Sequence, residues 1–112
     1  MTDGRPLSRP PATAPRRSVL IIDRDAETRL AARRVLEPAG FTVSSAAQRG
    51  ARAAGHFDLV IADLTAASLA ELRRQHPRAR VLRLSSQGGA DLAKPFTPSQ
   101  LLSAVRRCLA RR

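Results

Sequence analysis

Short runs of apolar residues recur along the chain, and each run is long enough to form a buried strand of a parallel sheet. The first run covers residues 19–22, and Asp23 follows it directly. A second strand is predicted over residues 57–62, which are apolar except for Asp58, and it also leads into an aspartate, Asp63. Two further strands are predicted over residues 41–44 and 81–85.

The segments between these runs are typical of helices. Asp25 is a suitable N-cap for a helix that reaches about Glu37, where Pro38 and Gly40 end it. Further helices are predicted over residues 46–54, over residues 66–75, and from Thr97 or Ser99 onward. This alternation of strands and helices predicts a parallel sheet with helices on both faces.

The segment before Lys94 poses a geometric difficulty. Residues 91–93 have the character of a very short fifth strand that Pro95 ends. Eight residues separate Ser85 from Lys94, whereas adjacent parallel strands need a crossover of about a dozen residues or more. Residues 91–93 are therefore either a minimal strand reached by an extended crossover or a segment that pairs with no strand.

Composition limits the class of protein. The 112 residues suffice for one domain. Residues 1–17 hold half of the prolines and show no apolar periodicity, which predicts a disordered basic leader before a domain over residues 18–112. Cys108 is the only cysteine, so an intramolecular disulfide is excluded and a reducing, cytoplasmic location is expected. No apolar run approaches the roughly 20 residues of a membrane span.

The formal net charge of +11 changes the expected partners more than the expected fold. Such a charge raises the affinity of a protein for polyanions in general, including nucleic acids and acidic proteins. No helix-turn-helix pattern or zinc-ligand spacing accompanies it. The charge therefore leaves nucleic-acid binding open as an alternative without a motif to support it.

Polar residues follow several of the predicted strands. Asp23, Asp63 and Ser85 stand at three strand ends, and Lys94 follows the doubtful fifth strand. In open parallel sheets, ligands bind beyond the carboxyl ends of the strands, so these side chains are expected to converge. A carboxylate can act as a nucleophile, carboxylates can hold a divalent cation, and a hydroxyl and an ammonium can bind phosphoryl oxygens. The set suits phosphoryl chemistry.

Four stretches resemble the receiver domain of bacterial response regulators, and the resemblance runs from about residue 18 to residue 112. They are residues 19–25, residues 34–41, residues 57–64 and the Lys94-Pro95-Phe96 turn. The resemblance implies a flavodoxin-like, doubly wound α/β domain with strand order 2-1-3-4 and an uncertain fifth strand. The helix that the family has between strands 4 and 5 is expected to be missing.

The resemblance also implies a two-component signalling function. Asp63 would accept a phosphoryl group from a histidine kinase or a phosphotransfer protein. Ser85 and Lys94 would contact that group, and Asp23 and Asp63 would bind Mg²⁺. The chain would then act on a downstream protein, since no output domain is expected on it, and would not be an enzyme.

One departure from the family weakens the expected metal site. The second acidic position after the first strand is Arg24, which has no lone pair for Mg²⁺ and repels it. Asp25 is not expected to substitute, because neighbouring side chains at a strand end point in different directions. We therefore expect an incomplete site, and hypothesise that the Arg24 guanidinium pairs with Asp63 or Asp23 in place of a cation.

Three functions remain open at this point. The first is a stand-alone receiver that is phosphorylated on Asp63 and passes the signal on. The second is a pseudo-receiver, which has the same fold but binds its protein partner without phosphorylation. The third is a basic protein that binds nucleic acid through its arginine-rich end and last helix.

Overall fold

A computed structural model describes residues 17–47, 56–63 and 68–110 of the chain. The predicted leader, apart from Arg17, lies outside the described residues, as does most of the helix predicted over residues 46–54. Ala46 itself is the last residue of a strand, so that helix does not begin there.

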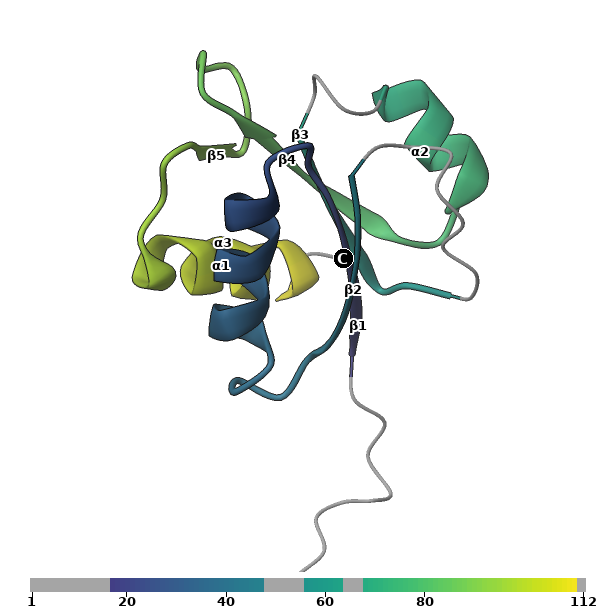
Figure 1. The fold of residues 1–112 in the computed structure, drawn as a ribbon. Helices are drawn as coiled ribbons and strands as arrows, with labels where there is room; N and C mark the ends of the chain where they lie inside the picture. Colours follow the sequence, from purple (N-terminus) through teal and green to yellow (C-terminus); the bar gives the residue numbers. More distant parts are fainter. Residues whose placement is uncertain (1–16, 48–55, 64–67, 111–112) are drawn as a thin grey trace, which may run out of the picture.

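The described strands form one parallel sheet in the order β2-β1-β3-β4-β5 (Figure 1). Their bounds are β1 Ser18–Ile22, β2 Thr42–Ala46, β3 Leu59–Asp63, β4 Arg80–Ser85 and β5 Leu92–Ala93. The predicted order is confirmed, and residues 92 and 93 do pair as a minimal fifth strand. Within the described residues, no helix joins β4 to β5.

Three described helices cover the two faces of the sheet. They are α1 Ala26–Leu36, α2 Leu69–Gln75 and α3 Pro98–Ala110. Helices α1 and α3 lie together on one face, and α2 lies on the other (Figure 1). This arrangement is the predicted doubly wound α/β fold. No described helix is long and apolar enough to cross a membrane.

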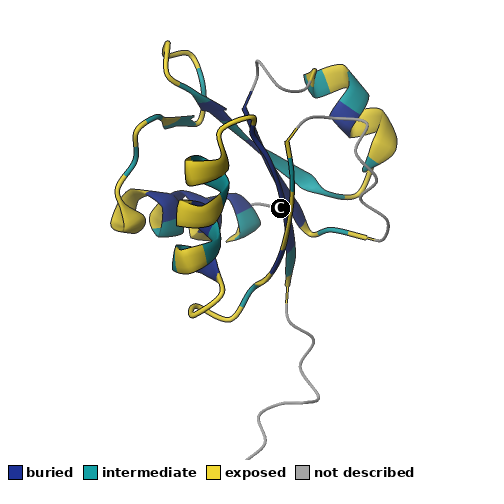
Figure 2. Cartoon of the chain, in the orientation of Figure 1, coloured by how far each residue is buried: buried dark blue, intermediate teal, exposed yellow. Residues whose placement is uncertain are grey.

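The alternation of side chains along each strand divides the core into two layers. Val19 and Ile21 of β1 pack toward α1 and α3, whereas Leu20 and Ile22 pack in the layer that contains Leu72 of α2. All four apolar residues of β1 are buried because the strand has a neighbour on each side and a layer on each face (Figure 2). The continuous apolar runs in the sequence reflect this two-sided burial.

The link between β4 and β5 explains how a parallel neighbour is reached without a long crossover. Strand β5 pairs only with the last two residues of β4, so the chain has to turn outward and back over a short distance. Gly88 and Gly89 make this reversal with φ angles of 84° and 73°, a left-handed conformation that glycine adopts readily. The backbone N–H of Asp91 then donates to the carbonyl of Arg83 at 3.0 Å, which brings the chain back beside β4.

Candidate functional site

Two buried aspartates lie at the carboxyl ends of adjacent strands. Asp63 is the last residue of β3, and Asp23 directly follows β1. Their residues are only 5% and 2% exposed, although both carry carboxylates. Because β1 and β3 are paired in parallel, the fold brings both carboxylates to one edge of the sheet. Buried carboxylates of this kind require a positive partner.

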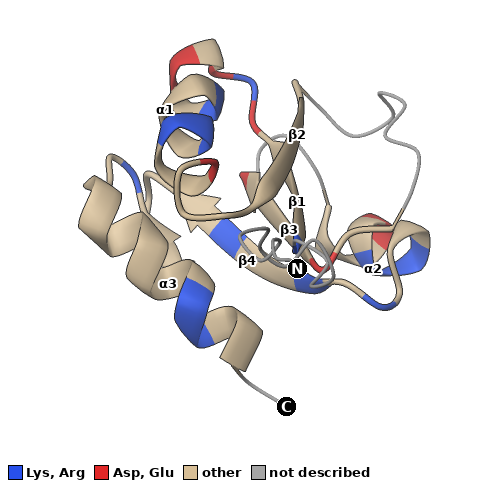
Figure 3. Cartoon of the chain, turned by 90° about the horizontal axis from the view of Figure 1, so that it is seen from below, with Lys and Arg blue, Asp and Glu red and all other residues tan. Residues whose placement is uncertain are grey.

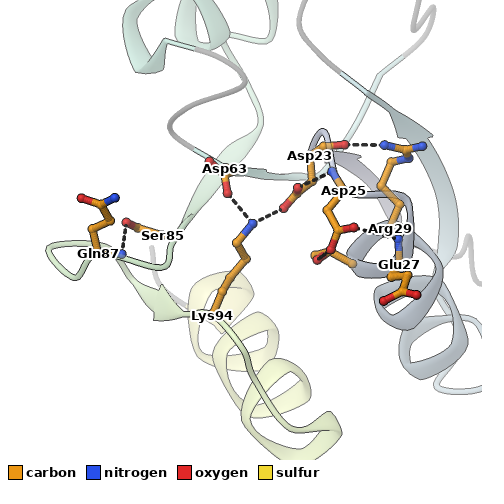
Figure 4. A network of polar contacts seen from close by, with 9 residues as sticks. Asp23, Asp25, Glu27, Arg29, Asp63, Ser85, Gln87 and Lys94 are labelled. Carbon is orange, nitrogen blue, oxygen red and sulfur yellow. Dashed lines mark hydrogen bonds and ion pairs between the residues drawn. The ribbon is translucent and has the colours of Figure 1, made fainter.

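Lys94 supplies that positive charge from the end of β5. Its Nζ lies 2.8 Å from Oδ2 of Asp23 and 2.5 Å from Oδ2 of Asp63 (Figure 4). Burial alone would lower the pKa of Lys94, but hydrogen bonds and attraction from both carboxylates outweigh it and raise the pKa above its ordinary value. Lys94 therefore remains an ammonium ion, and we call Asp23, Asp63 and Lys94 the ion triad. The peptide bond between Lys94 and Pro95 is cis.

Both carboxylate oxygens of Asp23 are engaged. Oδ1 accepts a hydrogen bond from the backbone N–H of Asp25 at 2.9 Å, and Oδ2 faces Lys94. Arg29 of α1 adds a further restraint, because its Nη1 donates to the backbone carbonyl of Asp23 at 2.6 Å. Asp23 is thus held at its side chain by the Asp25 N–H and Lys94, and at its main chain by Arg29 of α1.

Asp25 serves the start of α1 rather than the ion triad. Its side chain accepts hydrogen bonds from the backbone N–H of Glu27 at 3.3 Å and from the Thr28 hydroxyl at 2.7 Å. The Thr28 hydrogen bond is the main reason that the pKa of Asp25 lies below its ordinary value. The predicted N-cap is confirmed.

Arg24 does not take the place that we hypothesised for it. Its side chain is exposed, and none of the ion pairs among the described residues involves it. Successive side chains of an extended chain point in opposite directions. Because the Asp23 side chain is buried, that of Arg24 points to solvent. Lys94 makes the contacts with Asp23 and Asp63 that we had assigned to Arg24.

Ser85 lies at the same edge of the sheet, but its hydroxyl is turned toward the β4–β5 loop. Oγ accepts a hydrogen bond from the backbone N–H of Gln87 at 2.9 Å (Figure 4). Within the described part of the chain, no hydrogen bond joins this hydroxyl to Asp63 or Lys94. The carbonyl of Ser85 does accept from the backbone N–H of Lys94 at 3.0 Å, so Ser85 supports the lysine through the main chain.

The described residues at this edge do not form a complete Mg²⁺ site. Magnesium needs several oxygen ligands in octahedral geometry. Both oxygens of Asp23 already accept hydrogen bonds, and the Asp25 carboxylate caps α1. No group of three or more His, Cys, Asp or Glu side chains among the described residues could hold a metal ion. The Lys94 ammonium stands beside both carboxylates and supplies the charge that a cation would supply.

Sequence reasoning missed the contact between Arg83 and Asp91. The two side chains form an ion pair of 3.0 Å across the β4–β5 loop. The sequence does contain a signal for this ion pair. Arg83 interrupts an apolar strand, and such a side chain needs a polar partner on the same face of the sheet. The partner's position depended on a loop geometry that no periodicity predicts.

Solved structures of response regulators share this fold, whereas no protein-family model and no curated protein sequence matches the chain. A response regulator from Thermotoga maritima is 24% identical with a TM-score of 0.69, and covers 86% of this chain and 99% of its own. A CheY-like receiver domain from Methanospirillum hungatei is 21% identical with a TM-score of 0.71, over 85% and 94%. A response regulator from Burkholderia pseudomallei is 26% identical with a TM-score of 0.63, over 79% and 65%, and its structure contains a phosphorylated aspartic acid and a calcium ion.

These likenesses define the class of fold. The chain has the receiver fold of response regulators, with the strand order 2-1-3-4-5 and without a helix between β4 and β5 in the part that the structure describes. Within that fold, the ion triad consists of one lysine and two aspartates. Arg24, which follows Asp23 in the sequence, is not part of it.

Proposed function

We propose that this chain is a receiver-like signalling domain that acts by binding another protein, without Mg²⁺-dependent phosphorylation of Asp63. The observation that carries the proposal is the incomplete set of acidic ligands beside Asp23. Arg24, in the position after Asp23, is exposed, and the Asp25 carboxylate caps α1. A cytoplasmic, bacterial setting and a downstream protein partner belong to the same proposal.

The charge balance at the ion triad argues against easy phosphorylation. An aspartate that attacks a phosphoryl donor must approach a group of the same sign, so the site needs cations in addition to those that neutralise its own carboxylates. Lys94 is one positive charge shared by two carboxylates. Asp25 is committed to α1 and Arg24 is exposed, so neither completes a metal site.

The choice of lysine rather than arginine at position 94 supports a specific role for the ion triad. Lys94 is the only lysine among the 20 basic residues of the chain. A lysine ammonium is compact and presents three donors, whereas the guanidinium of arginine is a planar fork with a different shape. The one position that departs from the chain's use of arginine is the one that must fit between two aspartates. This supports a site whose geometry depends on the Lys94 ammonium.

Phosphorylation of Asp63 is the second candidate function. It is favoured by the position of Asp63 at the carboxyl end of β3, beside Lys94, in a fold shared with a structure that contains a phosphorylated aspartic acid. In that case the partner would be a histidine kinase or a phosphotransfer protein, and Lys94 would have to release Asp63 to contact the phosphoryl oxygens. Nucleic-acid binding stays a prediction, for which the described residues show no concentrated basic face.

Intact mass measurement after incubation with acetyl phosphate and MgCl₂ separates these two functions. We expect no phosphoryl adduct on the folded protein, while a receiver domain with a complete acidic pair gains one in a parallel reaction. Asp63→Asn tests the proposed acceptor, and Asp58→Asn, which removes a carboxylate at the opposite end of β3, is the matched control. An adduct that Asp63→Asn abolishes and Asp58→Asn retains would refute our proposal and support phosphorylation.

A further inference from the structure

We propose that Arg83 and Asp91 act as a clamp that fixes the register of β5 and thereby positions Lys94 between Asp23 and Asp63. Asp91 and Arg83 are then positioning residues of the ion triad, although neither touches it. The inference rests on the proposed function only in treating the ion triad as the functional centre, and it does not depend on whether Asp63 is phosphorylated.

The clamp consists of contacts between one carboxylate and one arginine, from both its side chain and its main chain. Oδ2 of Asp91 accepts from the backbone N–H of Arg83 at 2.8 Å and from its Nε at 3.1 Å, while Oδ1 accepts from Nη2 at 3.0 Å. The Asp91 N–H donates back to the Arg83 carbonyl at 3.0 Å. The Asp91 side chain is the first cause of the raised pKa of Arg83. A fork-shaped, bidentate contact of this kind fixes geometry as well as distance.

Strand β5 needs such a restraint because it is very short. It has two residues and pairs with β4 through Leu84 with Leu92 and Ser85 with Ala93. It also lies at the edge of the sheet, so none of the other described strands holds it from the far side. A two-residue pairing specifies its register weakly, and the clamp adds a fixed point immediately before the first paired residue.

The position of Lys94 is sensitive to that register. Each residue of a strand advances the chain by about 3.3 Å, and a slip of one residue turns every side chain to the other face. The Lys94 ammonium lies within 2.8 Å of both aspartates, so it would lose both contacts after such a slip. Asp91 is three residues before Lys94, and its side chain is hydrogen-bonded to Arg83 of β4.

The clamp also occupies the part of the sheet where no described helix lies. Val81 packs in the layer that contains Leu72 of α2, and Arg83 lies on the same face because side chains alternate along β4. The Arg83 and Asp91 side chains are 37% and 32% exposed there. On this face a polar clamp open to water restrains the chain next to β5, while Leu92 of β5 packs in the core layer that contains α1 and α3.

The single lysine makes the test specific. Lysine labelled with ¹³C and ¹⁵N gives one side-chain signal, that of Lys94. The rate of its acylation by an amine-reactive reagent, read from the Lys94 peptide by mass spectrometry, reports how often the ammonium leaves the two carboxylates. The variant is Asp91→Asn. The control is Glu37→Gln, which breaks an ion pair of similar exposure, 37% and 46%, between Arg33 and Glu37 on α1.

In Asp91→Asn we expect Lys94 to be acylated faster, by up to about fivefold, which is the upper end of the effect of losing one exposed ion pair. We also expect its side-chain signal to shift. Glu37→Gln should change neither, and Asp91→Glu should restore much of the protection. If Asp91→Asn fails to fold, Arg83→Gln removes the side-chain donors while the Asp91 carboxylate can still accept from the backbone, and the same acceleration supports the clamp. Folded variants with the wild-type signal and acylation rate would overturn it. Because neither measurement involves phosphorylation, this failure is distinct from failure of the proposed function.

Discussion

Lys94 links parts of the molecule that are distant in sequence. It joins Asp23, which is 71 residues earlier in the chain, to Asp63 across the edge of the sheet. Two carboxylates that are 2% and 8% exposed at their side chains repel each other strongly unless a cation lies between them. The stability of this edge of the fold should therefore depend on a single ammonium group.

Replacement of the lysine by an apolar residue of similar length tests this dependence. We expect Lys94→Met to lower the free energy of unfolding by about 3 kcal/mol, the lower end of the usual cost of breaking a buried pair by removal of one partner. Urea unfolding followed by circular dichroism measures it. Arg24→Met removes a neighbouring exposed cation without a described ion pair and should stay within about 0.5 kcal/mol of wild type. Equal effects of the two substitutions would contradict a special role for Lys94.

The comparison of wild type with Lys94→Met should also depend on pH. The raised pKa of Lys94 means that its stabilising effect is present in full below the ordinary pKa of lysine, about 10.4, and is lost as the pH rises through the higher pKa of the folded state. The difference in unfolding free energy between wild type and Lys94→Met should thus be constant between about pH 7 and pH 9 and shrink above pH 10. The chain has no tyrosine, so few other groups titrate in that range. A difference that grows above pH 10 would be incompatible with the ion triad.

Helix ends show how far local sequence signals determine the elements. Thr97 and Gln100 exchange hydrogen bonds at the start of α3, from the Gln100 N–H to Thr97 Oγ1 at 3.1 Å and from the Thr97 N–H to Gln100 Oε1 at 2.9 Å. This is a capping box, with Pro98 in the first helical position. Of the two cap residues that the sequence left open, Thr97 is therefore the one used, and Ser99 lies within the first turn.

Alanine substitutions at Thr97 and Ser99 test which of the two residues caps α3. Thr97→Ala should destabilise the protein by about 1 kcal/mol, because the Gln100 N–H loses its acceptor. Ser99→Ala, at an exposed position two residues on, should change the stability by less than about 0.5 kcal/mol. Urea midpoints measured in parallel decide the comparison. A larger effect of Ser99→Ala would show that the helix is capped differently.

The elements that the sequence predicted well are those with a regular pattern. The apolar runs that end at Asp23 and Asp63 specified two central strands, and adjacent parallel strands necessarily bring their carboxyl ends to one edge. The direction of a side chain beyond a strand end has no such pattern. Arg24 therefore turned out to point to solvent, and the Ser85 hydroxyl to bond Gln87. The pairing of β5 could not be predicted because it depends on the β4–β5 loop. The conformation of that loop is set by two glycines and by the clamp.

At the scale of the whole molecule, the basic residues that the structure describes are spread over several elements. Among the described residues, arginines lie on α1, α2, α3 and β4, with acidic residues between several of them (Figure 3). Arg33, Arg74 and Arg83 pair with Glu37, Glu71 and Asp91. A nucleic-acid interface normally concentrates basic side chains on one face or helix. The described charges are arranged more evenly than that, which favours a protein partner.

The sheet as a whole should open from the β5 edge inward. Strands β1 and β3 each have two neighbours and all their apolar residues are buried, whereas β5 has two residues and one neighbour (Figure 2). Local opening costs least where few buried contacts and few hydrogen bonds must break. We therefore expect the amides of β1 and β3 to exchange with deuterium slowest, at the rate set by global unfolding. The Lys94 amide, bonded to the Ser85 carbonyl, should exchange much faster, and faster still in Asp91→Asn. If the Lys94 amide were as protected as those of β1, β5 would be an integral part of the core, and its register would need no clamp.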